Sequence, residues 1–221
     1  MPEQPLVLPA EVIDLTAIPP LRRGNMRNIR VLPQFPGLVL KTVRPELVDQ
    51  RGRFLIRNRI QNLRHPGCQS AAKREVEEFL IQSRMRHWQV GYRLAIAHVF
   101  GFVPTTEGLG MLVERIVDAR GELAPTIGRL VRTNAFGPEH MAALESFWRR
   151  CRTDHVVVGD VHAANIAYTE CRSGGPECVC IDGFGEKAFF PVHRWSRWLN
   201  ARKLDRVRAR VMKSLSDHAD A

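Results

Sequence analysis

The chain has 221 residues, of which 44% are hydrophobic and 25% are charged, so it is long enough to bury a substantial core in one domain or two small lobes. No run of 18 apolar residues occurs, and the N-terminal MPEQPLVLPA lacks a basic segment followed by an apolar stretch. We therefore expect a soluble, cytoplasmic protein with no signal peptide and no membrane insertion. The formal net charge of +10 favours acidic partners, namely nucleotide phosphates, nucleic acid or an anionic membrane surface.

The cysteines number five and include no C-x-x-C pair. An odd count without paired spacing indicates reduced thiols, and it argues against a disulfide framework or a zinc site.

The first third of the chain alternates apolar and polar residues between turn signals. Apolar stretches at 11–18 and 29–35 flank PPLRRGNMRN, and a Pro-Gly pair separates the second stretch from LVLKTV. We expect three successive antiparallel strands. On the third, Val39, Lys41 and Val43 share one face, so the lysine either meets a partner or extends past the valines to solvent.

One helix is predicted after this region. Ser70 can cap AAKREVEEFLIQSRMRHW, in which Val76, Phe79, Leu80 and Ser83 have helical spacing. At about 100° per residue, Glu75 and Glu77 flank the apolar face at similar angles, whereas Glu78 lies nearly opposite. The helical geometry therefore excludes Glu78 from an inward role and leaves the other two open.

The rest of the chain predicts two strands, two helices and a small hairpin. LAIAHVFGFVP and GLGMLVERIVDARGEL are strand-like and joined by TTEG, and TIGRLVRTNAF and PEHMAALESFWRRC have helical spacing with Pro138 in the first turn of the latter. The stretches VVV, NIAY and CVCI predict short strands, the last two joined by a hairpin loop, ECRSGGPE.

The C-terminal RWSRWLNARKLDRVRAR predicts an amphipathic helix whose outer face is basic. A solvated face is the favoured reading of this charge, ahead of an RNA or membrane contact. Trp195 and Trp198 are expected to pack the C-terminal region onto the rest of the fold.

The stretch VVVGDVHAANIAY places polar groups between two buried runs. Asp160 and Asn165 are five residues apart, and Asp182 follows CVCI, so these side chains can converge at one end of the predicted hairpin. Oxygen ligands of this kind suit Mg²⁺, and D-x-x-x-x-N followed by a second Asp matches the kinase arrangement. The alternative is that these residues only cap turns. His162 is interpreted as a loop-organising histidine that hydrogen-bonds the backbone, because H-x-x-N is not a zinc pattern.

These motifs resemble the protein-kinase-like superfamily, and GDVHAAN is similar to the G-D-x-H-x-x-N loop of aminoglycoside phosphotransferase-type kinases. More specifically, residues 20–200 are similar to the bacterial YrbL-type family of kinase-like proteins associated with the PhoP regulatory network. The stretches that carry this resemblance are LKTV, KREVEEFL, GMLVERIVDARGEL, VVVGDVHAANIAY and CVCIDGFGEKAFFPVHRWSRW.

The resemblance implies an α+β, two-lobed protein-kinase-like fold. Residues 1–117 would form an N-lobe with an antiparallel sheet and one helix, through the hinge. Residues 118–221 would form a reduced, mostly helical C-lobe with the catalytic loop and the basic helix. The resemblance also implies that ATP and Mg²⁺ are cofactors and that the acceptor of the phosphoryl group is a small molecule or a protein.

Site roles follow from the same resemblance. Lys41 would contact the nucleotide phosphates, and Glu75 would be its helix partner, chosen over Glu77 by the resemblance and not by helical geometry. Asp160 would be the catalytic aspartate. The remaining assignments are Asn165 and Asp182 as metal ligands, Glu114 to Ile116 as the adenine-binding hinge and Gly24 in the phosphate loop.

The chain also departs from the kinase pattern. RRGNMRN contains one glycine where kinases commonly have several, so Arg22, Arg23 or Arg27 would have to supply charge in place of backbone amides. The turn reads D-G-F-G, and few residues follow it. Three functions stay open: a phosphotransferase, a kinase-like regulatory module that binds nucleotide or protein without turnover, and a basic RNA-binding protein.

Overall fold

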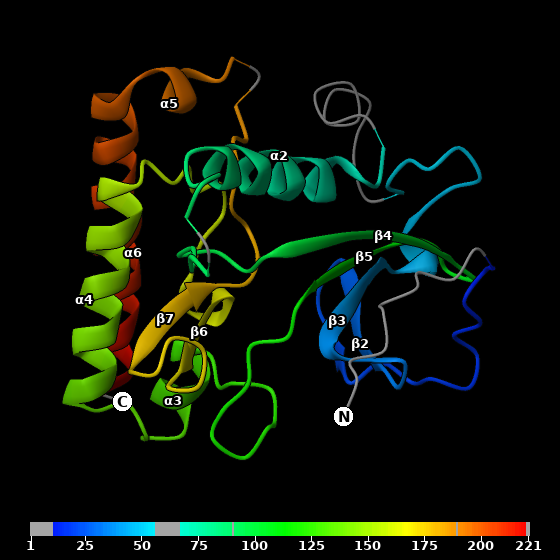
Figure 1. Cartoon of the computed structure of the whole chain (residues 1–221), viewed down its shortest axis with the longest axis horizontal. Helices are drawn as coiled ribbons and strands as arrows, with labels where there is room; N and C mark the ends of the chain where they lie inside the picture. The colour runs from blue at the N-terminus through cyan, green and yellow to red at the C-terminus, as the bar shows by residue number, and fades with distance from the viewer. Residues whose placement is uncertain (1–10, 56–66, 90, 189, 220–221) are drawn as a thin grey trace. The chain divides into compact units, whose positions relative to one another are not determined.

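The computed structural model describes residues 11–55, 67–89, 91–188 and 190–219 (Figure 1). The N-terminal MPEQPLVLPA and part of the basic segment RPELVDQRGRFLIRNR lie outside these ranges. The chain divides into two compact units, Met1–Ser70 with Val99–Arg115 and Ala71–His98 with Ile116–Ala221. The expected division at residue 117 would place 71–98 in the first lobe, whereas here this segment packs with the second unit; the lobe assignment stays a prediction.

The first unit contains a five-stranded antiparallel sheet in the order β1-β2-β3-β5-β4. Its strands are β1 (Arg22–Arg23), β2 (Arg27–Leu32), β3 (Phe35–Val43), β4 (Val99–Thr105) and β5 (Gly108–Glu114), and a short 3-10 turn, η1 (Pro45–Leu47), follows β3. Leu38 and Leu40, which share one face of β3, are buried in a cluster with Leu32 and Leu112. On the other face, Lys41 is buried in register with Ile29 and Met111 of the neighbouring strands.

The prediction of a strand at residues 11–18 was wrong. Ile13 and Leu15 are buried, but this segment makes a single bridge, from Ile13 to Thr105. The Asp14 carboxylate accepts hydrogen bonds from the backbone N–H and the hydroxyl of Thr16 at 2.9 and 2.8 Å. This local turn replaces ladder hydrogen bonds, because a short Asp side chain competes with strand pairing for backbone donors.

Helix α2 (Ser70–Arg84) forms where predicted, but its buried face is different. The buried side chains are Ala72, Glu75, Glu78 and Gln82, whereas Leu80 is 59% exposed. Placing Glu78 on the outside was therefore wrong. Two of these polar side chains bind backbone groups of the second unit, which compensates for the loss of their hydration.

The remaining elements belong to the second unit. They are α3 (Ile127–Arg132), α4 (Pro138–Thr153), η2 (Ala163–Asn165), β6 (Ile166–Thr169), β7 (Glu177–Cys180), α5 (Val192–Trp195) and α6 (Arg197–Ala219). Helices α3 and α4 and the β6–β7 hairpin confirm the predicted elements, and Pro138 occupies the first turn of α4. Apolar residues of α4, such as Phe147, pack with Leu204, Val207 and Val211 of α6 in one core cluster. All five cysteines lie in the described ranges, and none of them forms a disulfide.

The prediction that Trp195 and Trp198 pack onto the rest of the fold was wrong. Their side chains are 71% and 62% exposed. The inward positions of α6 belong to Asn200, Leu204 and Val207, and helical spacing turns Trp198 away from them. No helix in the described part of the chain is long and apolar enough to span a membrane.

Candidate functional site

Two loops of the second unit are hydrogen-bonded to each other at one end of the β6–β7 hairpin. We call residues 156–165 and 181–187 the loop pair. The N–H groups of Gly159 and Asp160 both donate to the Gly183 carbonyl, at 2.9 and 2.7 Å, and Gly185 N donates to the Val157 carbonyl at 2.7 Å. These contacts surround a bridge between Val158 and Phe184, so the backbone itself fixes the register of one loop against the other.

The loop pair brings together the segments that contain Asp160, Asn165 and Asp182, the three residues with oxygen-bearing side chains that the sequence singled out. Asn165 Nδ2 donates to the Asp160 carbonyl at 3.3 Å. Gly183, the neighbour of Asp182, has a φ of 79°, and a Cβ there would lie 2.4 Å from the Asp160 carbonyl oxygen and 3.2 Å from Asn165 Nδ2. Only glycine permits this approach, so the D-G of the turn is a packing requirement.

Lys187 joins this set, although sequence reasoning gave it no role. Its Nζ lies 3.4 Å from Asp160 Oδ2, and the two side chains are 50% and 69% exposed. An exposed pair of this kind adds little to stability. Its consequence is chemical, because an ammonium group stands beside the carboxylate that the motif singles out.

A buried glutamate of α2 supports the start of the first loop. Glu78 is 1% exposed, and its Oε1 accepts hydrogen bonds from Val157 N and Gln82 Nε2, both at 3.0 Å. Gln82 Nε2 also contacts the carbonyls of Asp154 and His155 at 3.2 and 3.3 Å. Burial raises the pKa of Glu78, although the Val157 and Gln82 hydrogen bonds act in the opposite direction. No local signal could identify this role, because the amide that Glu78 binds is 79 residues away.

The C-terminal part of the second loop contacts α2 and α5. Gly185 has a φ of 94°, and a Cβ there would lie 2.5 Å from the Arg74 carbonyl of α2. Glu186 accepts hydrogen bonds from Ala188 N and His193 N, both at 3.1 Å, and its Oε1 lies 3.0 Å from His193 Nδ1. Burial favours a higher pKa for Glu186, but these hydrogen bonds outweigh it and lower the pKa.

The prediction that the His162 ring organises the loop was wrong. Its side chain is exposed and makes no capping hydrogen bond at the start of η2. Its backbone carbonyl instead accepts from Asn165 N at 2.8 Å. The backbone conformation, and not the imidazole, holds this turn.

The first unit contains the remaining predicted site residues. Gly24 lies in the turn between β1 and β2, where its N–H donates to the Arg27 carbonyl at 2.8 Å. Glu114 ends β5 in register with Leu38. The predicted pairing of Lys41 with Glu75 stays a prediction.

Ile116, the other predicted hinge residue, belongs to the second unit and is 5% exposed. Its carbonyl already accepts a hydrogen bond from Ala124 N at 2.9 Å. An adenine ring would therefore have to use other backbone groups of this segment, or share this oxygen.

The donor set of the loop pair fits a magnesium ion only with help from a substrate. Among the described residues, no group of three or more His, Cys, Asp and Glu side chains could hold a metal ion. Asp160 and Asp182 supply carboxylates, and Asn165 has its Oδ1 for a ligand because its Nδ2 serves the Asp160 carbonyl. Mg²⁺ commonly takes one or two carboxylates and completes its shell with phosphate oxygens and water, so these residues suit an ion that arrives with a nucleotide.

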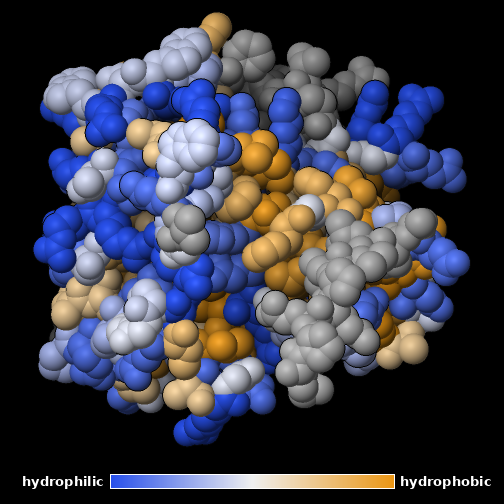
Figure 2. Space-filling view, in the orientation of Figure 1, coloured by the Kyte–Doolittle hydropathy of each residue, from blue (hydrophilic) through white to orange (hydrophobic). Residues whose placement is uncertain are grey.

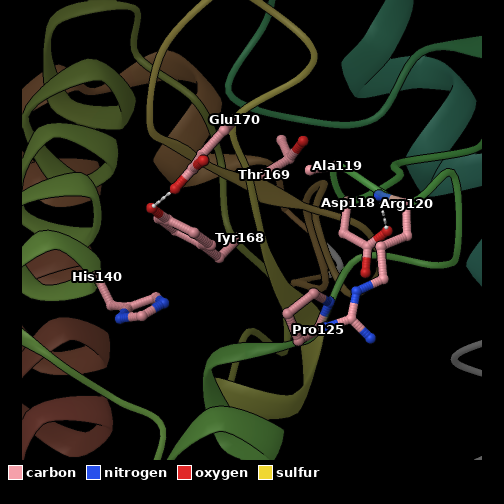
Figure 3. Close-up of a pocket in the computed structure, with 8 residues that line it drawn as sticks. All are labelled: Asp118, Ala119, Arg120, Pro125, His140, Tyr168, Thr169 and Glu170. Atoms are coloured by element: carbon pink, nitrogen blue, oxygen red, sulfur yellow. Dashed lines mark hydrogen bonds between the residues drawn. The ribbon is translucent and has the colours of Figure 1, made fainter.

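A small pocket of the second unit lies apart from the loop pair (Figure 3). It has a volume of about 200 Å³ and includes Tyr168 and Thr169 at the far end of β6 from the loop pair. Inside it, Tyr168 donates to Glu170 at 2.7 Å, and burial raises the pKa of Tyr168, with Glu170 adding to the shift. None of the predicted site residues lines this pocket, so it is not the site indicated by the motifs. Its remaining lining residues are Asp118, Ala119, Arg120, Pro125 and His140.

A protein-family model described as PhoP regulatory network protein YrbL matches residues 13–216. The match covers both units, and the chain belongs to this family. The resemblance that the sequence motifs indicated at family level is thereby confirmed. None of the curated proteins compared with the chain matches it.

Proposed function

We propose that this member of the YrbL family is an ATP- and Mg²⁺-dependent phosphotransferase with a two-lobed, kinase-like fold. The observation that carries the proposal is the loop pair, in which backbone hydrogen bonds bring the segments of Asp160, Asn165 and Asp182 together. Turn-capping alone would explain each residue separately. It gives no reason for both loops to converge around a glycine that admits no side chain.

Asp160 is the proposed catalytic residue. Its exposed carboxylate would accept the proton of an acceptor hydroxyl as that oxygen attacks the γ-phosphorus, while the bond to the bridging oxygen of the departing ADP breaks. Lys187 stands close enough to Asp160 to orient it or to meet phosphate charge. The acceptor is a small molecule or a protein with a hydroxyl group.

Asn165 and Asp182 would hold Mg²⁺ through the amide oxygen and a carboxylate oxygen. The ion, when bound with the nucleotide, supplies neutralisation of charge on the phosphate oxygens. In the first unit, buried Lys41 on a central strand suits a contact with the α/β-phosphates, with Glu75 as its proposed partner. Gly24 would lie at the phosphates, and Glu114 and Ile116 at the adenine.

A second function is a nucleotide-binding regulatory protein without turnover. The β1–β2 turn favours it, because β1 has two residues, both exposed, and the turn contains one glycine. Such a turn offers few backbone amides to phosphate, which weakens the case for efficient transfer.

The nucleotide proposal is tested by the melting temperature of the full chain with and without saturating Mg·ATP. A ligand that binds the native state must raise the melting temperature, so we expect a shift that grows with ligand concentration. For Asp182→Asn we expect the Mg²⁺-dependent part of the shift to disappear, with the matched substitution Asp205→Asn, at an exposed position of α6, retaining it. No shift with the wild-type chain would rule out nucleotide binding.

Turnover is tested by ATP consumption. Asp160→Asn should lower the rate by at least about 100-fold while leaving the thermal shift in place, because the loss falls on proton transfer. A wild-type chain that binds Mg·ATP and consumes none in the presence of candidate hydroxyl acceptors would favour the regulatory function. Consumption unaffected by Asp160→Asn would place the chemistry elsewhere.

A further inference from the structure

Large apolar side chains are exposed where α5 gives way to α6. Phe190, Trp195 and Trp198 are 65%, 71% and 62% exposed, and Leu199 is 36% exposed. The core side of α6 is made by Leu204, Val207 and Val211, and none of the four exposed residues belongs to that core cluster. Large apolar side chains that stay exposed close together in the sequence indicate a surface that meets a partner.

A row of cations continues from this group along the outer face of α6. Arg202, Arg206 and Arg210 follow one another at four-residue intervals, and Lys213 extends the row, over about 16 Å of helix. Among the side chains that the structure describes, no carboxylate forms an ion pair with Arg202, Arg206 or Arg210. The ion pairs of α6 there join Asp205 to Arg152 and Arg208 to Glu145.

The aromatic group and the cationic row adjoin each other. The Arg202 guanidinium lies 4.4 Å from the ring centroid of Trp198, which is a cation–π distance. Figure 2 shows mostly hydrophilic side chains, with paler ones among them, over the flank where Figure 1 places α4, α5 and α6. We call the two sets together the basic aromatic face.

We propose that the basic aromatic face docks on the surface of an anionic lipid bilayer. A straight row of cations on a helix can touch a flat array of lipid phosphates at the same time, and each Lys or Arg near such a surface strengthens binding by about fivefold. Trp rings suit the headgroup region, and Phe190 and Leu199 suit the acyl boundary beneath it.

Single-stranded nucleic acid is less well matched by the same residues. Sites of that class place aromatic rings among the cations along a groove, so that successive bases stack. Here the aromatic side chains stand at one end of the row, and Leu199 offers no ring for a base. The separation of apolar from charged side chains fits a bilayer. The aromatic end of the face would enter the headgroup region, and the row of cations would lie across the lipid phosphates.

The test is sedimentation of the full chain with vesicles of phosphatidylcholine alone and of phosphatidylcholine with phosphatidylglycerol. We expect binding to the anionic vesicles only, weakened by salt because the contact is electrostatic. The triple variant Arg202→Gln, Arg206→Gln, Arg210→Gln should bind about 100-fold more weakly. The double variant Trp195→Ser, Trp198→Ser should also bind more weakly while keeping the salt dependence.

A charge-matched control separates this face from general attraction. Arg120→Gln, Arg129→Gln, Arg132→Gln removes three exposed cations from another part of the second unit. We expect this variant to lose much less affinity than the α6 triple variant. Equal losses in the two variants, or no binding of the wild-type chain to anionic vesicles, would overturn the proposal. So would binding to a single-stranded RNA that requires the α6 arginines when vesicles are not bound.

Discussion

The loop pair of the second unit and the β1–β2 turn of the first unit are both proposed to meet nucleotide phosphates, yet they are built differently. In the loop pair, backbone groups distant in sequence bind one another, and Gly183 and Gly185 fit against carbonyl oxygens with no room for a side chain. The turn is closed by a hydrogen bond between Gly24 and Arg27, and both residues of β1 are exposed.

The difference indicates that the acidic part of the proposed site is fixed by contacts between distant segments. The basic turn, apart from the hydrogen bonds that Arg44 donates to the Gly24 and Met26 carbonyls, is set by short-range contacts at the surface. Changes in the loop pair should therefore lower the free energy of unfolding, and equivalent changes in the turn should not. The predictions below test this contrast, from the largest expected effect to the smallest.

Gly183→Ala should lower the free energy of unfolding by roughly 2–5 kcal/mol, because it combines an unfavourable φ with overlap on the Asp160 carbonyl. Denaturant unfolding of the full chain measures this loss. Gly174→Ala is the matched control, since Gly174 has the same φ of 79° and an added Cβ there would meet nothing within 4 Å. It should lose about 1 kcal/mol, and equal losses in the two variants would refute the packing requirement.

Glu78→Ala should cost about 1–3 kcal/mol, because it leaves the buried Val157 N–H without its acceptor. The comparison is Glu77→Ala on the same helix, where the lost partner is Arg194 at a more exposed site. That change should cost about 1 kcal/mol or less. If Glu77→Ala lowered the free energy of unfolding more than Glu78→Ala does, the inference that Glu78 supports the loop pair would be wrong.

Glu78→Gln should change the pH dependence of stability. Because burial raises the pKa of Glu78, the folded chain holds this proton more tightly than the unfolded chain does. The resulting stability is fully present below the ordinary glutamate pKa of 4.5, and it is lost as the pH rises through the raised value. Electrostatic attraction to Arg194 and His155 lowers the pKa of Glu78, and so reduces this effect without reversing it.

Glutamine keeps an acceptor for Val157 and cannot ionise. The melting temperature of Glu78→Gln relative to wild type should therefore increase as the pH rises above 4.5. Thermal unfolding across this range measures the difference. A constant difference would mean that Glu78 does not titrate at a raised pKa in the folded chain.

Gly24→Ala should change the free energy of unfolding by no more than about 0.5 kcal/mol. Gly24 does not have a left-handed φ, and the nearest atom to an added Cβ is the Arg27 carbonyl oxygen at 3.2 Å. The same denaturant experiment applies. A loss comparable to that of Gly183→Ala would remove the contrast between the two regions.

Local pattern was sufficient for most elements of this chain. Alternation in LVLKTV identified which residues of β3 share a face, helical spacing and Pro138 identified α4, and the run ECRSGGPE identified the β6–β7 loop. Each depends on neighbours a few residues apart, and such neighbours determine backbone preference directly. The strand prediction at 11–18 was wrong because Asp14 forms a local turn, which apolar alternation does not reveal.

Positions of polar side chains were not predictable in this way. A helical projection counts a glutamate as outward, but Glu78 lies inside because its partner is the Val157 amide. The same projection could not establish that Trp195 and Trp198 are left exposed by the course of α5 and α6. Both outcomes depend on elements far apart in the chain.

The sequence by itself determined most of the strands and helices, the family, and the residue types that stand in the two loops, because these follow from local spacing and motif. Only the tertiary structure decided that Gly183 fits between Asp160 and Asn165, that Glu78 supports the first loop, and that Arg202, Arg206 and Arg210 of α6 are exposed. The physical reason is that a buried polar group must find a hydrogen-bond partner wherever folding supplies one, and that partner is specified by packing across the whole chain.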